Sequence, residues 1–302
     1  MKDNIRKVVD KMPYLSKLIS KLRSRVGKQG AWPAGHYYSP IPARGDVISN
    51  LKKLSETASL PDVNFRNEAQ RELLGEYTSY YEQVPFPAEK TSGFRFYYHQ
   101  DFFGYGDAIF LYSFIRHFKP RRIIEIGSGF SSAVMLDTLE RFSYGKVDVT
   151  FIEPYPTRLL GTLKAEDKAS VKIIEKKVQE VDHGLFNSLQ AGDLLFVDSS
   201  HVVKFGSDVQ KIFYDILPKL PVGVFVHFHD IFSLFEYPAT WLSEGRYWNE
   251  IYFLRSFLSY NDSWEIVFFN HYAGIEFKDR LAEKMPLCLK NTGGSIYLKR
   301  VK

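Results

Sequence analysis

Short apolar stretches alternate with helical stretches from Pro120 to the end of the chain, and this alternation is the feature that most constrains the fold. Strands are expected at residues 122–126, 147–152, 171–178, 194–197, 222–229, 265–270 and 295–298. Helices are expected between them at 131–142, 157–163, 184–189, 207–217 and 247–259. Such alternation places parallel strands in one sheet that helices cover on both faces. We therefore predict a doubly wound α/β fold with a seven-stranded, mostly parallel sheet, in which only the last, hairpin-like pair departs from the pattern.

The first 104 residues have a different character and predict an N-terminal helical and extended extension. Residues 1–30 carry nine Lys and Arg and two Asp among apolar residues at helical spacing, which predicts a basic amphipathic helix. This helix is expected to pack on its own domain or on a second subunit of a homo-oligomer, with peripheral membrane contact as the alternative. Proline and glycine in 31–60 predict extended structure, and helices are expected at 67–81 and 106–118. The predicted domains are thus 1–104 and 105–302.

Composition excludes several classes of protein. The formal net charge is +5, and the chain is near neutral after residue 30, which argues against nucleic acid as a partner. The only cysteine is Cys288, so an intrachain disulfide and a Cys-based metal site are excluded. No apolar run approaches the roughly 18 residues that a membrane span needs. The N-terminus lacks the uninterrupted apolar segment of a secretory signal, so a cytoplasmic protein is expected.

Two glycines, Gly127 and Gly129, directly follow the first predicted strand. Glycine permits a sharp turn and lets a ligand approach the main chain closely. The dinucleotide fingerprint requires a third glycine at the position that Ser132 occupies, and no phosphate-loop Gly-Lys-Ser or Gly-Lys-Thr follows. Glu153 stands at the end of the second predicted strand, where a carboxylate can accept hydrogen bonds from both ribose hydroxyls. Together these residues predict a site for a nucleoside ligand that lacks phosphates.

With Ile123–Gly129, Glu153 and Val197-Asp198, the chain resembles class I S-adenosylmethionine-dependent methyltransferases over roughly residues 105–300. It looks closest to the branch that modifies sugars and other small hydroxylated natural products. The resemblance implies a Rossmann-like fold, S-adenosylmethionine as cofactor, a glycine loop that holds the methionyl portion, and Glu153 on the ribose. Val178 and Gln179 would border the adenine. The implied cofactor-binding residues are Glu125, Gly127, Ser128, Gly129, Glu153, Gln179 and Asp198.

Acidic and histidine side chains follow the fourth and fifth predicted strands, whose ends are neighbours in such a sheet. His201 or His229 would act as the catalytic base that removes the proton of an acceptor hydroxyl. Alternatively, Asp198, His229 and Asp230 would hold a divalent metal ion that lowers the pKa of that hydroxyl. Metal-dependent relatives in the superfamily often have an acid where His229 stands. A purely structural cluster is the third interpretation.

His227 lies deeper in the fifth strand and is expected to be a core histidine with a hydrogen-bond partner. Two segments are candidates for the acceptor pocket. Residues 103–107 contain two glycines, although they also fit a simple helix start, and the aromatic connection over 235–248 fits a substrate lid.

The predicted function is O-methylation of a small hydroxylated or glycan-type acceptor. A nucleotide-dependent oxidoreductase is the first alternative, and the missing third glycine disfavours it. A non-catalytic interaction module is the second alternative, and the intact Gly127, Gly129 and Glu153 disfavour that.

Overall fold

The computed structural model describes residues 31–51 and 60–302, and the chain divides into two compact units. One unit comprises Met1–Ser55 with Ala239–Tyr247, and the other comprises Glu56–Pro238 with Trp248–Lys302. The basic helix expected over residues 1–30 lies outside the described residues. The boundary expected at residue 104 falls inside the second unit, where helix α4 (Asn67–Tyr81) packs on helix α5 (Tyr105–Phe118).

Among its described residues, the first unit contains two short helices, α3 (Arg44–Leu51) and α11 (Ala239–Glu244). Residues 31–43 before α3 form turns and bends instead of the extended structure expected over 31–60. Their prolines and glycine favour such turns. Helix α3 was not expected from the sequence, and Val47 is its buried residue. Trp32, Tyr37 and Tyr38 are exposed.

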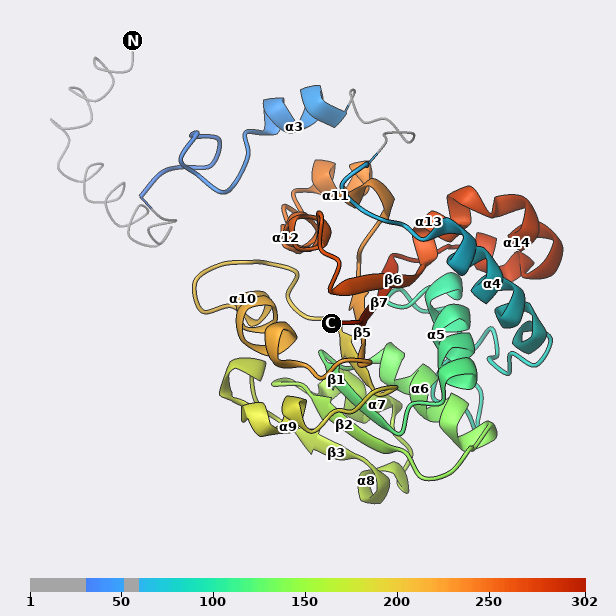
Figure 1. The fold of residues 1–302 in the computed structure, drawn as a ribbon. Coiled ribbons are helices and arrows are strands. Elements are labelled where there is room, and N and C mark those ends of the chain that lie inside the picture. Colours follow the sequence, from blue (N-terminus) through green and yellow to red (C-terminus); the bar gives the residue numbers. More distant parts are fainter. Residues whose placement is uncertain (1–30, 52–59) are drawn as a thin grey trace, which may run out of the picture. The chain divides into compact units, whose positions relative to one another are not determined.

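The second unit contains a seven-stranded sheet in the order β3-β2-β1-β4-β5-β7-β6 (Figure 1). The strands are β1 (Arg122–Ile126), β2 (Asp148–Ile152), β3 (Lys172–Ile174), β4 (Leu194–Val197), β5 (Phe225–His229), β6 (Trp264–Phe269) and β7 (Ser295–Arg300). Strands β1 to β5 are parallel, and β7 is antiparallel to both β5 and β6. The predicted fold class is confirmed. The last pair is not a hairpin, because α13 (Asn270–Glu276) and α14 (Lys278–Lys284) lie between its strands.

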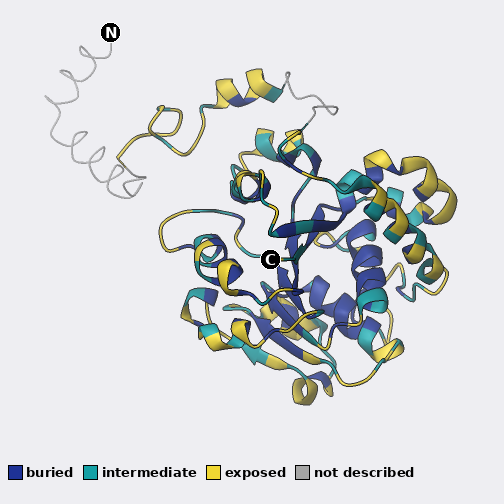
Figure 2. Cartoon of the chain, in the orientation of Figure 1, coloured by how far each residue is buried: buried dark blue, intermediate teal, exposed yellow. Residues whose placement is uncertain are grey.

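Helices cover both faces of this sheet. The remaining helices of the second unit are α6 (Phe130–Arg141), α7 (Thr157–Thr162), α8 (Asp167–Ser170), α9 (His183–Asn187), α10 (Asp208–Lys211) and α12 (Glu250–Leu258). Phe114 of α5 contacts Phe225 and Tyr297 on one face, with ring centroids 5.2 and 4.6 Å apart. Phe213, in the π-helical turn after α10, contacts Phe228 on the other face at 5.4 Å. The central strands β1, β4 and β5 and helix α5 are accordingly among the most buried elements, whereas the edge strand β3 is not buried (Figure 2).

In the described part of the chain, no helix has both the length and the apolar character needed to cross a bilayer. Helix α5 is buried from Gly106 to Ile115 but is only 14 residues long. Its apolar character therefore reflects its position in the core of the second unit.

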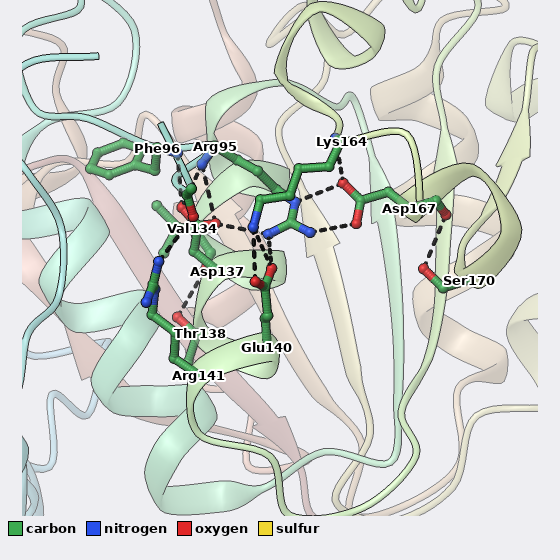
Figure 3. Close-up of polar contacts among 11 residues, drawn as sticks. Arg95, Phe96, Val134, Asp137, Thr138, Glu140, Arg141, Lys164, Asp167 and Ser170 are labelled. Carbon is green, nitrogen blue, oxygen red and sulfur yellow. Dashed lines mark hydrogen bonds and ion pairs between the residues drawn. The ribbon is translucent and has the colours of Figure 1, made fainter. Parts of the chain in front are cut away.

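A buried arginine fixes the segment before α5 to α6 and α8 (Figure 3). Arg95 is 6% exposed; its Nε donates to Asp167 at 2.7 Å, and its Nη1 donates to Asp137 at 2.9 Å and also to Glu140. The backbone amides of Arg95 and Phe96 also donate to Asp137, each at 2.9 Å. Lys164 pairs with Glu140 at 2.8 Å. We call Arg95, Asp137, Glu140, Lys164 and Asp167 the Arg95 cluster.

Candidate active site

The glycine turn joins β1 to α6 and lies against the end of β4. Gly127 has φ +80°, and a Cβ at this position would lie 1.7 Å from the carbonyl oxygen of Asp198, so only glycine fits without a shift of the main chain. The amide of Gly127 donates to the carbonyl of Ile152 at 3.0 Å, and the amide of Asp198 donates to the carbonyl of Ile126 at 2.9 Å. The turn is therefore fixed between the ends of β2 and β4, where ligands of such sheets bind.

Glu153, which follows β2, is held by backbone amides. Its Oε2 accepts from the amide of Ser128 at 3.2 Å, and its Oε1 accepts from the amide of Tyr155 at 2.8 Å. The half-buried carboxylate lines two adjoining hollows of about 430 and 440 Å³, which we call the first and the second hollow. The residues common to both are Gly127, Glu153, Asp198, Ser199 and Ser200.

The two hollows contain most of the residues that the sequence assigns to the cofactor. The first hollow is lined by Gly127, Ser128, Gly129, Glu153 and Asp198, and Gln179 lines the second together with Val178. Gln179 is positioned by its amide group, which donates to the carbonyl of Gly206 at 2.9 Å.

Glu125 lies beneath the glycine turn and lines neither hollow. Its side chain is completely buried and accepts hydrogen bonds from the hydroxyls of Ser131, at 2.5 Å, and Ser132. Burial raises the pKa of Glu125 to about 8. In the structure this residue supports the first turn of α6, which differs from the direct cofactor contact that the sequence suggested.

Four side chains of the expected cluster meet at the ends of β4 and β5. The Nε2 atom of His201 lies 3.4 Å from Asp198 and 3.4 Å from Asp230, and Nε2 of His229 lies 3.6 Å from Asp230. Ligand atoms of Asp198, His201 and Asp230 all lie within 4.8 Å of one another. The candidate metal ligands in the structure are therefore Asp198, His201 and Asp230, with His201 in place of the His229 that the sequence suggested.

His201 is oriented by Glu250, which no sequence motif pointed to because 49 residues separate the two. Nδ1 of His201 donates to Oε2 of Glu250 at 2.9 Å, and Glu250 is 1% exposed. The carbonyl of His201 also accepts from the amides of Asn249 and Glu250, each at 3.1 Å, so the loop after β4 is joined to the start of α12. Trp248 packs on the imidazole, with ring centroids 4.5 Å apart.

The charges around His201 shift its pKa. Burial lowers the pKa of this imidazole, but hydrogen bonds with Asp198 and Glu250 outweigh burial and raise it well above its ordinary value. His201 and Asp230 also have φ of 59° and 56°, a left-handed conformation that is uncommon outside glycine and concentrates at functional sites.

His229 is oriented by a second buried carboxylate. The hydroxyl of Ser295 donates to Asp107 at 2.5 Å, so its oxygen accepts from Nδ1 of His229 at 3.1 Å. The Nε2 atom of a neutral His229 therefore carries no proton and can accept one. Burial lowers the pKa of His229, but Asp198, Asp230 and Asp107 outweigh burial and raise it. Asp107, which the sequence placed in the first turn of a helix, thus orients a histidine of the site.

His227 is a core histidine, as expected, but the expected hydrogen bond is absent. It is completely buried, and neither ring nitrogen has a hydrogen-bond partner among the described residues. Its ring stacks on Phe196 with centroids 3.7 Å apart. Burial lowers the pKa of His227 well below its ordinary value, so this imidazole is neutral.

Phe103, from one candidate segment for the acceptor pocket, lines the first hollow and packs on His229 with ring centroids 5.1 Å apart. Phe102 lines the same hollow. From the other segment, Trp248 lines the first hollow, whereas residues 239–247 belong to the first unit. A lid formed by 235–248 stays a prediction.

Comparisons with known proteins match the chain to a family model and to a relative in sequence. A family model described as a methyltransferase domain matches residues 124–231. An uncharacterized protein of Archaeoglobus fulgidus is 33% identical over 174 residues, which are 55% of this chain and 76% of that relative. A methyltransferase domain thus occupies residues 124–231 of this chain. In the methyltransferase, the matched residues include the glycine turn, Asp198, His201 and Asp230.

Solved structures show more distant similarity to the methyltransferase. The Podospora anserina methyltransferase PaMTH1 with bound S-adenosylhomocysteine is 16% identical, with a TM-score of 0.42, and the match covers 85% of this chain and 95% of that one. The O-methyltransferase TomG of Streptomyces achromogenes is 13% identical, with a TM-score of 0.41, and the match covers 85% and 96%.

Proposed function

We propose that the methyltransferase transfers a methyl group to a hydroxyl oxygen of a small hydroxylated or glycan-type acceptor. The observation that carries this proposal is the meeting of the glycine turn and Glu153 with two oriented histidines in one hollow. A cytoplasmic location and a homo-oligomer belong to the same proposal and rest on the sequence alone.

The two hollows suggest how the cofactor lies. S-adenosylmethionine, when bound, supplies an electrophilic methyl group on a positively charged sulfur. We place its methionyl portion at Gly127–Gly129 in the first hollow, because the backbone there is open to close approach. Glu153, at the junction of the hollows, would accept from the ribose hydroxyls, and Val178 with Gln179 would border the adenine in the second hollow.

The proton of the acceptor hydroxyl must leave as the methyl group arrives. His229 is the base that the geometry favours, because Ser295 and Asp107 fix its Nδ1 proton and leave Nε2 to accept. The carboxylate of Asp230, 3.6 Å from this Nε2, would stabilise the imidazolium that forms. Among the expected bases, His201 is less suited, because it already lies between Asp198 and Glu250.

The side chains around His201 fit a divalent metal ion. Asp198, His201 and Asp230 offer two carboxylates and one imidazole, and Glu250 fixes the second ring nitrogen of His201, as carboxylates commonly do for metal-bound histidines. A bound ion would lower the pKa of the acceptor hydroxyl. We therefore assign the third ligand to His201, in place of the His229 that the sequence suggested.

The proposal is tested on the full chain. Isothermal titration calorimetry is expected to show binding of S-adenosylhomocysteine, and turnover is expected with hydroxylated acceptors, sugars included. EDTA should abolish turnover, and added Mg²⁺ or Mn²⁺ should restore it, because the ion activates the hydroxyl. No detectable binding of S-adenosylhomocysteine would overturn the proposal. Turnover that EDTA leaves unchanged would overturn its metal component and leave His229 as the base.

Substitution of Glu250 tests the orientation of His201. Glu250→Gln is expected to weaken the affinity for Mn²⁺ by about 10–100-fold, because loss of such a partner carboxylate leaves the metal-binding imidazole less basic and less fixed. Calorimetric titration with Mn²⁺ measures this affinity. Glu283→Gln, which changes an exposed glutamate of α14, is the matched control. Equal Mn²⁺ affinity in the two variants would contradict the assigned role.

A further inference from the structure

The first hollow contains an arginine to which neither the sequence motifs nor the proposed chemistry assigns a role. Arg158 lies in α7 and lines this hollow together with Gly129 and Glu153. We propose that Arg158 binds the carboxylate of the amino-acid end of S-adenosylmethionine. This inference rests on the proposed function, because it requires the methionyl portion at the glycine turn.

The position of Arg158 is fixed from two sides. Its aliphatic stem lies over the glycine turn, since a Cβ at Gly129 would be 3.0 Å from Cδ of Arg158. Its guanidinium lies over the ring of Phe102, with Cζ 3.8 Å from the centroid. Phe102 in turn stacks on Phe130, with ring centroids 5.9 Å apart and planes at 10°. A guanidinium that packs over an aromatic ring can still present its N–H donors to a planar anion.

The donors of Arg158 are not used within the described part of the chain. No hydrogen bond or ion pair joins Arg158 to another of these residues; its guanidinium stacks on Phe102, and its charge contributes to lowering the pKa of Asp198. Arg95 and Arg255 differ, because Arg95 is bound by the acids of its cluster and Arg255 donates to Asp62 at 2.7 Å. Arg158 thus presents free donors beside the hollow, in the fork geometry that matches a carboxylate.

The charges of the first hollow suit a ligand that carries both signs. Glu153 and Asp198, which contact the glycine turn, give this part of the hollow negative charge, which favours a sulfonium and an ammonium group. The same charge repels a carboxylate except near a cation, and Arg158 is the only Lys or Arg among the described residues that line this hollow. His201 and His229 also line it, but Nε2 of each already faces the carboxylate of Asp230. The first turn of α6 begins at Phe130 beside it, and amides of a first helical turn attract anions. The carboxylate therefore belongs beside Arg158.

Binding of two nucleosides distinguishes contacts to the carboxylate from contacts to the rest of the cofactor. S-adenosylhomocysteine has the amino-acid end, and 5′-methylthioadenosine lacks it. Arg158→Met is expected to weaken binding of S-adenosylhomocysteine about 10–100-fold, as the loss of hydrogen bonds to a charged group does. Binding of 5′-methylthioadenosine should change by less than about twofold, because its contacts lie at Glu153 and the second hollow. Calorimetric titration of each variant with each nucleoside gives the four affinities.

Arg141→Met is the matched control. Arg141 also stacks on a phenylalanine, with Cζ 3.8 Å from the ring centroid of Phe94, but it lines neither hollow. Both affinities should stay at the wild-type values in this variant. Equal weakening of the two nucleosides by Arg158→Met would show that Arg158 only supports the turn, and would overturn the inference.

Two other outcomes separate the remaining possibilities. Unchanged affinity for S-adenosylhomocysteine with a raised KM for the acceptor would show that Arg158 binds a carboxylate of the acceptor, which also overturns the inference. If wild-type protein binds 5′-methylthioadenosine but S-adenosylhomocysteine no more tightly, the nucleoside site of the proposed function stands while the carboxylate site fails. Binding of neither nucleoside to wild-type protein would defeat the proposed function itself.

Discussion

Arg95→Met is expected to lower the free energy of unfolding by about 3–5 kcal/mol, the cost of breaking a buried ion pair from one side. Asp137 and Asp167, at 0% and 3% exposed, would keep their charges without a cation between them. Burial already raises the pKa of Asp137, which shows how costly its charge is at this position. Urea denaturation followed by circular dichroism measures the change. A loss below about 1 kcal/mol would contradict this role for the Arg95 cluster.

A second variant tests whether the lost stability comes from the unpaired charges of Asp137 and Asp167. When both are replaced by asparagine in the Arg95→Met background, part of the lost stability should return, because the amides remove the buried charges while their oxygens still accept from the backbone amides. Glu140 remains paired with Lys164 at the surface. Arg141→Met, at an exposed position of α6, the helix that carries Asp137 and Glu140, should change stability by less than about 1 kcal/mol and serves as the control.

Asp230→Asn is expected to lower kcat by about 10²–10⁴-fold, the range that general acid–base catalysis contributes. The substitution removes the negative charge that Nε2 of His201 and Nε2 of His229 both face, at 3.4 and 3.6 Å. It also removes one proposed metal ligand. Asparagine tolerates the left-handed backbone at this position, φ 56°, so the fold should not change. Initial-rate measurements with S-adenosylmethionine and a hydroxylated acceptor test the effect.

Binding of S-adenosylhomocysteine distinguishes lost chemistry from lost structure in this variant. Its affinity for Asp230→Asn should stay within about twofold of wild type, since the glycine turn and Glu153 are unchanged. Asp262→Asn, an exposed carboxylate paired with Lys302, is the control and should retain full turnover. If Asp230→Asn keeps more than about a tenth of wild-type turnover, neither the metal nor the histidine base depends on this carboxylate.

The sheet and the main features of the site could be predicted because they depend on local patterns. Apolar runs and the turn at Gly127 predicted the strands, and strand order then brought Asp198 and Asp230 together. The short helices α3, α8, α11, α13 and α14 were missed, because they have too few turns to show a clear period. The starts of β3 and β5 were placed one and three residues too early, at 171 and 222, and the end of β3 was placed four residues too late, at 178.

The residues that orient the two histidines could not be predicted. Glu250 begins a helix 49 positions after His201, and Ser295 follows His229 by 66 positions, so each pairing depends on tertiary packing. Glu125 was assigned to the cofactor from the sequence, but its side chain lines neither hollow. Its place beside the glycines suggested a ligand contact, but the alternation of a strand directs its side chain beneath the turn, where Ser131 and Ser132 bind it.

Gly127, Glu153 and Asp198–Ser200 form a wall common to both hollows, so in the proposed binding mode the adenosine end of the donor and the group that receives the methyl would contact the same few residues. Binding of one ligand can then change the affinity for the other, and such coupling is reciprocal. Any factor by which the acceptor tightens or loosens the donor is the factor by which the donor changes affinity for the acceptor. An unidentified acceptor can therefore be recognised through its effect on donor affinity, before any methylated product is detected.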